Sequence, residues 1–273
     1  MNRYQKMFHR LGEERSGALV PFTVLGDPDP GTSLAVVRQL AASGADALEL
    51  GLPFSDPVAD GPVVQAASTR ALAAGVRQEQ CWAIVERIRD EYPDLPIGLL
   101  VYANLVMHQD VNRFYARAAE AGVDSVLVAD APLIEGDALA VAARAHGLAP
   151  VFIAPPNAEE ARLASIARES EGYVYVVSRS GVTGVDESLR LDARQLIARL
   201  IALGSAPPLL GFGISNPDQV RSALAIGARG AISGSAIVGR IEQHLGNPVE
   251  MLGSIGTFVA QMKAATLSGD RNV

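Results

Sequence analysis

The stretch ALELGLPFSDPVADGP, residues 47–62, brings three carboxylates close together along the chain. Glu49 lies inside a short apolar run, DALELG, whereas Asp56 and Asp60 follow in a loop rich in proline and glycine. Side chains alternate along a strand, so Glu49 faces away from the side on which its two leucine neighbours lie. Burial raises the pKa of a carboxyl, which allows it to donate and accept protons near neutral pH. Glu49 is therefore the first candidate for acid–base catalysis.

Both loop aspartates also suit an ordinary turn. Asp-Pro and Asp-Gly pairs favour turns, and Asp60 stands just before a helical pattern that it could cap. In an acid–base pair, two carboxylates play different roles because their surroundings differ. A strand carboxylate beside a loop carboxylate fits that description, so the residues leave catalysis and capping open for Asp60.

Two glycine-rich turns late in the chain predict a binding site for a phosphate group. GFGISNPDQV (211–220) and SGSAIVG (233–239) each follow an apolar run and lead into a helical pattern. The N–H groups and the dipole of a helix N-terminus bind anions without a basic side chain, and neither turn contains lysine or arginine. The glycines alone could also serve tight packing. The residues expected to approach the phosphate are Gly211, Gly213, Gly234 and Ser235.

These residues need a scaffold in which strands alternate with helices. Apolar runs rich in β-formers alternate with stretches whose apolar residues recur every three or four positions. Runs that are apolar on both faces indicate a parallel sheet covered by helices, and eight of them favour a closed (β/α)8 TIM barrel of the α/β class. The eight runs are residues 18–25, 46–51, 97–104, 124–130, 149–154, 173–178, 207–213 and 229–234.

An open doubly wound sheet is the competing fold. It would need a glycine-rich nucleotide loop after the first strand, but the first run leads into LGDPDPG, whose prolines lack N–H groups. We therefore predict a single barrel domain over residues 1–273. We expect residues 1–16 to form an extra helix that caps the barrel bottom, and a flexible tail to begin at about residue 267.

Composition excludes several classes of protein. The net charge of −7 argues against a nucleic-acid partner. The single cysteine, Cys81, permits no disulfide within the chain, and neither a secretory signal nor a membrane-length apolar run is found, so we expect a cytoplasmic protein. Lys6 and Lys263 are the only lysines and lie near the ends, which speaks against a Schiff-base mechanism. The four histidines are scattered and give no metal-ligand pattern.

Strand alternation also predicts what lines the upper barrel. The positions predicted to face the lumen are Phe22, Leu100, Tyr102, Leu127 and Tyr175. Such an apolar and aromatic surface suits a planar hydrophobic group better than a plain sugar. The loop SRSGVTGVDESL, residues 178–189, follows the sixth run and could close over a bound phosphate as a lid.

Several segments of the chain resemble the tryptophan synthase alpha subunit family. They are PFTVLGDP, ALELGLPFSDPVADGP, IGLLVYAN, DSVLVADAP, SRSGVTG, GFGIS and GAISGSAIV, and the similarity runs from Arg3 to about Thr266. The resemblance implies a carbon–carbon lyase of tryptophan biosynthesis, which cleaves indole-3-glycerol phosphate to indole and glyceraldehyde 3-phosphate in a retro-aldol reaction. It implies that Glu49 transfers protons, and that Asp60 accepts a hydrogen bond from the indole N–H and stabilises positive charge on the ring.

The resemblance also assigns the two halves of the substrate site. The phosphate would lie on Gly184, Gly213, Gly234 and Ser235. The indole would lie among Phe22, Leu100, Leu127 and Tyr175. The predicted substrate site is completed by Tyr102, Thr183, Gly211 and Phe212.

The family works with a beta subunit that carries pyridoxal phosphate and receives indole through a channel. The resemblance therefore implies an alpha-beta-beta-alpha heterotetramer and no cofactor in this chain. The residues expected at the interface are Pro53, Asp56, Asn104, Met107 and Pro132. Apolar residues in the rim loops 104–107 and 132–134 support an interface independently, since a monomer rarely leaves them exposed.

Three alternatives remain at this point. One is a free-standing lyase that releases indole without a partner. Another is a different phosphate-binding barrel enzyme, such as a sugar-phosphate epimerase or a thiamin-phosphate-type synthase, although these use metal ligands or a basic pyrophosphate site that the sequence lacks. The third is a non-catalytic phosphate-binding scaffold, which the presence of both Glu49 and Asp60 disfavours.

Overall fold

The computed structural model describes residues 1–108, 110–131, 133–177 and 187–267. In this part of the chain nine strands, all paired in parallel, follow the order β5-β4-β3-β2-β1-β9-β8-β7-β6. The strands are β1 Ala18–Val24, β2 Leu48–Gly51, β3 Ile97–Val101, β4 Ser125–Val128, β5 Ala149–Val151, β6 Ile153–Ala154, β7 Val174–Val177, β8 Pro208–Gly211 and β9 Gly230–Ser233.

The sheet closes on itself between β5 and β6. These two strands stand at opposite ends of the order, yet only Phe152 separates them in the chain. They are two halves of one interrupted strand, because β5 pairs with β4 while β6 pairs with β7. The predicted eight-stranded barrel is confirmed, with the difference that the run 149–154 is split at Phe152. The carbonyl of Phe152 still accepts a hydrogen bond from the Tyr175 N–H at 3.1 Å.

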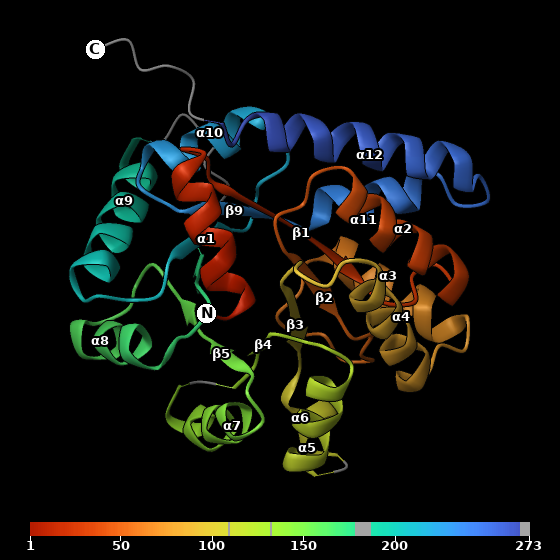
Figure 1. The fold of residues 1–273 in the computed structure, drawn as a ribbon, viewed down its shortest axis with the longest axis horizontal. Coiled ribbons are helices and arrows are strands. Elements are labelled where there is room, and N and C mark those ends of the chain that lie inside the picture. The colour runs from red at the N-terminus through yellow and green to blue at the C-terminus, as the bar shows by residue number, and fades with distance from the viewer. Residues whose placement is uncertain (109, 132, 178–186, 268–273) are drawn as a thin grey trace.

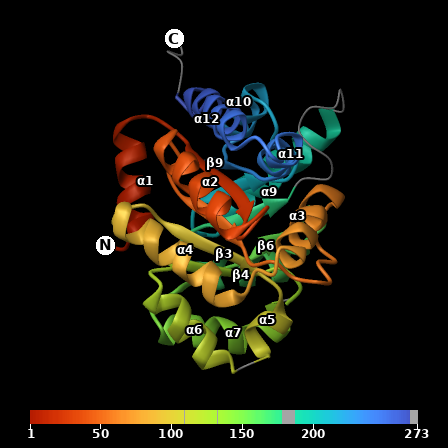
Figure 2. The same ribbon diagram turned by 90° about the vertical axis from the view of Figure 1, so that its right-hand side faces the viewer.

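Helices surround the barrel, as Figures 1 and 2 show from two sides. The helices are α1 Arg3–Glu13, α2 Pro30–Ala42, α3 Pro62–Ala73, α4 Gln78–Glu91, α5 Ala103–Met107, α6 Val111–Glu120, α7 Leu133–Ala145, α8 Glu160–Glu169, α9 Glu187–Ala202, α10 Pro217–Ala225, α11 Ser235–Gln243 and α12 Pro248–Ala264. Among the described residues, none of the helices combines the length and the apolar character that crossing a membrane requires.

The alternation of side chains in β2 divides the interior into two layers. Leu48 and Leu50 are fully buried in the cluster that joins the strands to the helices. Ala47 belongs to the second cluster, which fills the barrel itself together with Phe22 of β1. Glu49 shares the face of Ala47, so it points into the barrel lumen as the sequence predicts.

The N-terminal helix α1 closes the bottom of the barrel, as predicted. The Asn2 side chain caps it by accepting a hydrogen bond from the Gln5 N–H at 2.9 Å. Its buried face consists of Tyr4, Met7 and Leu11, which pack into the inner cluster of the barrel. The residues after α12 run back to this end, where Ser16 and Leu267 form an antiparallel bridge. The rest of the predicted tail, residues 268–273, lies outside the described part of the chain.

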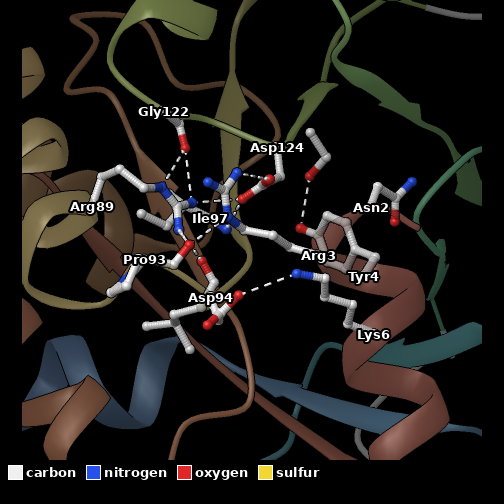
Figure 3. Close-up of polar contacts among 12 residues, drawn as sticks. Asn2, Arg3, Tyr4, Lys6, Arg89, Pro93, Asp94, Ile97, Gly122 and Asp124 are labelled. Atoms are coloured by element: carbon white, nitrogen blue, oxygen red, sulfur yellow. Dashed lines mark hydrogen bonds and ion pairs between the residues drawn. The ribbon is translucent and has the colours of Figure 1, made fainter.

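A cluster of charged groups surrounds Asp124 at the barrel bottom (Figure 3). One carboxylate oxygen of Asp124 accepts a hydrogen bond from Arg3 Nη1 at 2.9 Å. The other accepts from Arg89 Nη2 at 2.7 Å and from the Ile97 N–H at 2.8 Å. This carboxylate therefore ties α1, α4 and the starts of β3 and β4 together.

Both lysines also lie at the barrel bottom. Lys6 of α1 pairs with the exposed Asp94 at 3.4 Å. Lys263 of α12 pairs with the buried Asp46 at 2.7 Å, and Arg10 Nη2 reaches the same carboxylate at 2.8 Å. No lysine of this chain therefore lies at the C-terminal ends of the strands, where a Schiff-base aldolase would need one.

Candidate active site

A pocket of about 710 Å³ opens at the C-terminal ends of the strands. This is the end at which barrel enzymes place their chemistry. Its walls come from β1, β2, β3, β7 and β9, the turn after β8, and the starts of α3 and α11. The lining residues are Phe22, Glu49, Asp60, Gly61, Val64, Leu100, Tyr175, Phe212, Gly213, Ile214, Ser215, Ile232, Gly234, Ser235 and Ala236.

Glu49 is buried at the floor of this pocket, with 1% of its surface exposed. The Tyr173 hydroxyl donates a hydrogen bond to Glu49 Oε1 at 2.6 Å. Burial raises the pKa of Glu49 to about 7, the negative charge of Asp60 adds to the rise, and the Tyr173 hydrogen bond opposes it. No ion pair joins Glu49 to a cation within the described residues, so its carboxyl can be protonated or charged near neutral pH.

Tyr173 is itself held from below by the N-terminal helix. Its ring lies 5.6 Å from that of Tyr4, centroid to centroid, in a tilted arrangement. The Tyr4 hydroxyl in turn forms a hydrogen bond of 2.8 Å with Ser125 Oγ. A column of buried polar groups therefore connects α1 at the barrel bottom with the carboxyl at the pocket floor.

Asp60 stands at the start of α3, on the pocket wall. The Tyr102 hydroxyl donates to Asp60 Oδ2 at 3.0 Å and accepts from the Ala59 N–H at 3.1 Å. Burial raises the pKa of Asp60, and the hydrogen bond from Tyr102 opposes the rise. The helix is capped by Gly61, without a side-chain hydrogen bond, so capping is not the role of the Asp60 carboxylate.

The two helices expected to bind phosphate differ at their N-termini. At α10 the Asn216 side chain accepts a hydrogen bond from the Gln219 N–H at 3.0 Å, and Gln219 Oε1 accepts from the Asn216 N–H at 3.1 Å. The end of α10 is thus satisfied by its own side chains. Helix α11 follows Gly234, which offers no side-chain cap, and its first residues line the pocket. The open helix end in this pocket is therefore that of α11.

The turn after β8 faces the pocket with two residues in the left-handed region of backbone conformation. Phe212 has a φ of 68° and Gly213 a φ of 74°. Such a conformation is costly for phenylalanine, which is half exposed here, and is typical of strained segments at functional sites. Gly211, just before them, is covered by the Tyr175 ring, and a Cβ at this position would lie 2.3 Å from ring atoms.

Most of the substrate-site residues predicted from the sequence line this one pocket. Those that line it are Phe22, Glu49, Asp60, Leu100, Tyr175, Phe212, Gly213, Gly234 and Ser235. Tyr102 lies behind Asp60, Gly211 lies under Tyr175, and the fully buried Leu127 belongs to the barrel core. Thr183, Gly184 and the rest of the predicted lid up to residue 186 lie outside the described residues.

Several pocket residues were not predicted from the sequence. They are Gly61, Val64, Ile214, Ser215, Ile232 and Ala236, with Tyr173 behind Glu49. Tyr173 carries a signal that could have found it, since it stands two positions before Tyr175 and so shares the lumen face. Ile232 lies in β9, so alternation could also have found it. The remaining residues belong to turns and helix starts, where side-chain direction does not follow a simple alternation.

The residues predicted at a partner interface lie on the rim around the pocket mouth. Asp56, Asn104 and Met107 are exposed, and Pro53 is half-buried. Pro132 lies outside the described residues. Val58 and Met107 expose 79% and 62% of their surfaces, so the rim carries apolar side chains open to solvent. Within the described part of the chain, no cluster of histidine, cysteine, aspartate or glutamate could hold a metal ion.

Comparisons with known proteins agree with this geometry. The family model described as tryptophan synthase alpha chain matches residues 8–267. The chain belongs to this family. The alpha chain of Pectobacterium atrosepticum is 55% identical over 268 residues, covering 98% of this chain and 100% of that one. The alpha chain of Edwardsiella ictaluri is 54% identical over 266 residues, covering 97% and 99%.

Solved structures extend the tryptophan synthase likeness to three dimensions. The alpha chain of Legionella pneumophila subsp. pneumophila has a TM-score of 0.89 and 30% identity, with 100% of both chains covered. A chain from the tryptophan synthase a2b2 complex of Pyrococcus furiosus has a TM-score of 0.83 and 35% identity, covering 90% of this chain and 98% of that one. As a tryptophan synthase alpha chain, the protein is a carbon–carbon lyase of tryptophan biosynthesis.

Proposed function

We propose that this pocket cleaves indole-3-glycerol phosphate to indole and glyceraldehyde 3-phosphate, with Glu49 as the proton-transferring group and Asp60 as its partner. The observation that carries the proposal is one pocket that joins a buried carboxyl of pKa about 7 to the open N-terminus of α11. The first can move protons at neutral pH, and the second can hold a phosphate group.

In the retro-aldol reaction the bond between indole C3 and the glycerol side chain breaks. Protonation at C3 places positive charge on the ring, and removal of the proton from the adjacent glycerol hydroxyl then expels neutral indole and leaves an aldehyde. Glu49 can serve both steps, because near its pKa the carboxyl is present in both protonation states. The indole ring accepts the bonding electrons, so the cleavage requires neither a Schiff base nor a metal ion.

Asp60 stabilises the charge that develops on the indole ring. Its carboxylate accepts a hydrogen bond from the indole N–H, which becomes more acidic once C3 is protonated. The hydrogen bond from Tyr102 favours the charged form of Asp60 and fixes its orientation. The interaction strengthens as positive charge builds up on the ring. It therefore stabilises the transition state of the cleavage more than it stabilises the bound substrate.

The two ends of the substrate contact two different sets of pocket residues. The phosphate is bound by N–H groups of Gly234, Ser235 and the turn at Gly213, with Gly184 as a further contact implied by the family pattern. The indole lies among the apolar side chains of the pocket. These are Phe22, Leu100 and Tyr175, with Leu127 in the core beneath them.

A beta subunit covers the rim of the pocket and receives the indole. The exposed Val58 and Met107 support a protein partner at this face, and the Pyrococcus furiosus relative is described in an a2b2 complex. In this assembly the pyridoxal phosphate belongs to the beta subunit and the alpha chain carries no cofactor of its own. A cytoplasmic location stays a prediction from the sequence.

Two aspartates of one loop provide a matched test. Asp60 lines the pocket, whereas Asp56 lies exposed on the rim and hydrogen-bonds Ser55. Asp60→Asn should slow indole release from indole-3-glycerol phosphate by roughly 100-fold, as expected when a charge-stabilising group is lost. Asp56→Asn should leave the rate of the isolated chain within about twofold. Equal rates for both variants would contradict the role of Asp60.

The same assay separates the alternatives. A wild-type chain that releases no indole, alone or with a beta subunit, would contradict the lyase and favour another barrel enzyme or a phosphate-binding scaffold. Identical rates with and without the beta subunit would favour a free-standing lyase. We expect the partner to raise the rate, since the loops it covers carry Asp60.

A further inference from the structure

Arg240 lies directly behind the open end of α11. Its Nη1 donates a hydrogen bond of 2.6 Å to the carbonyl of Ala236, one turn earlier in the same helix. Its guanidinium carbon lies 3.8 Å from the centre of the Phe258 ring on α12, which packs beside α11 (Figure 2). The side chain therefore runs back along the helix and is held with its charge near the N-terminus of α11.

The charge of Arg240 has no carboxylate partner among the described residues. Arg70, on the neighbouring helix α3, is the contrasting case. Its guanidinium forms two hydrogen bonds of 2.9 Å with the buried Asp27, and a third of 3.0 Å with Glu242. Burial lowers the pKa of Arg240, yet an arginine side chain stays charged at neutral pH. Arg240 is thus a half-buried cation balanced only by a ring face and one carbonyl.

The position of this cation matters for the pocket. Ala236 lines the pocket, and the Arg240 hydrogen bond ends at the carbonyl of that same residue. With a helical rise of about 1.5 Å per residue, the guanidinium is within roughly 10 Å of an anion bound at the first N–H groups of α11. Over such a distance a partly buried charge attracts an anion enough to change its Kd several-fold.

We propose that Arg240 strengthens the binding of the substrate's phosphate group through its charge, without touching the phosphate. This inference rests on the proposed phosphate site. It explains why a cation is kept half-buried without a carboxylate: the bound phosphate dianion supplies the missing negative charge. The pocket lining, which contains neither lysine nor arginine among the described residues, would then act together with a cation one layer behind it.

Two neutral variants and one charged variant test the role of the charge. Arg240→Gln and Arg240→Met remove it, and Arg240→Lys retains it. Arg168→Gln, on the exposed surface of α8, controls for the change in net charge. The Kd values of inorganic phosphate and glyceraldehyde 3-phosphate are measured by calorimetry with the full chain, at low salt and near 1 M salt. Thermal melting confirms that each variant is folded.

We expect both neutral variants to bind the two ligands about three- to tenfold more weakly at low salt. The difference should shrink near 1 M salt, where charges are screened beyond about 3 Å. Arg240→Lys and Arg168→Gln should bind within about twofold of wild type. Wild-type affinity in a folded neutral variant would overturn the inference, as would an equal loss at both salt concentrations or in Arg240→Lys, which would indicate packing. A wild type that binds neither ligand would instead overturn the phosphate site itself.

Discussion

The two ends of the barrel hold their carboxylates in opposite ways. At the bottom, Asp46 and Asp124 are each bound by two cationic side chains and by a backbone N–H. In the pocket at the C-terminal ends of the strands, Glu49 and Asp60 are each bound by a tyrosine hydroxyl, and burial raises both of their pKa values. A carboxylate held between two cations joins the elements that carry them. A buried carboxylate without a cationic partner has a raised pKa, and that of Glu49, about 7, lets it take up and release a proton near neutral pH.

Replacing Glu49 should have the largest effect on activity without lowering stability. Glu49→Gln keeps the shape of the side chain but cannot transfer a proton, so indole formation should fall by about 1000-fold. The melting temperature should stay the same or rise, because a buried carboxyl that resists ionisation gives way to a neutral amide. Indole release and thermal melting of the same preparation check both parts. A Glu49→Gln variant that keeps its activity but melts at a lower temperature would contradict this prediction, since Glu49 would then serve stability rather than catalysis.

The matching change at the bottom should have the opposite outcome. Asp124→Asn leaves Arg89, which is largely buried, without its anionic partner and should lower the free energy of unfolding by about 3 kcal/mol. Activity of the folded variant should stay near that of wild type, since the site lies at the other end of the barrel. Urea unfolding measures the loss. Asp94→Asn is the control, because Asp94 is exposed and its pair with Lys6 contributes little.

A smaller effect should follow from the hydroxyl that contacts Glu49. The hydrogen bond from Tyr173 favours the charged carboxylate and so lowers its pKa. Tyr173→Phe removes it, and the ionisation of Glu49 in the pH profile of kcat/KM should move to higher pH, by up to about one unit. Tyr115→Phe is a matched control, since Tyr115 is equally buried but lies in the cluster between the strands and the helices. A shift to lower pH in Tyr173→Phe would contradict this assignment.

The barrel and the direction of Glu49 could be predicted because both depend on local pattern. Apolar runs of strand length and their alternation place Glu49 in the lumen without knowledge of any distant residue. The role of Asp60 could not be derived in this way. Its partner Tyr102 is far away in the sequence, and spacing alone left capping open until the structure placed Gly61 at the cap. The family resemblance, rather than periodicity, supplied that assignment.

The difference between the two glycine-rich turns shows a signal that was available but ambiguous. Asn216 and Gln219 are three positions apart, the spacing of a capping box, and the structure has this box at α10. The sequence therefore contained the reason why the N-terminal N–H groups of α10 are capped by side chains whereas those of α11 are not. The break of the fifth strand at Phe152 had no such signal, since it depends on how the sheet closes around the barrel.

The pKa of Glu49 is the quantity on which the contrast between the pocket and the barrel bottom depends. It can be measured by NMR titration of the side-chain carboxyl carbons between pH 4 and 9, with Glu49→Gln used to assign the resonance. The account predicts a midpoint near 7, because burial and the nearby charge of Asp60 disfavour the charged form more than the Tyr173 hydrogen bond favours it. A midpoint near 4.5, the ordinary value for glutamate, would contradict it, since Glu49 would then be a permanent anion with no proton to give.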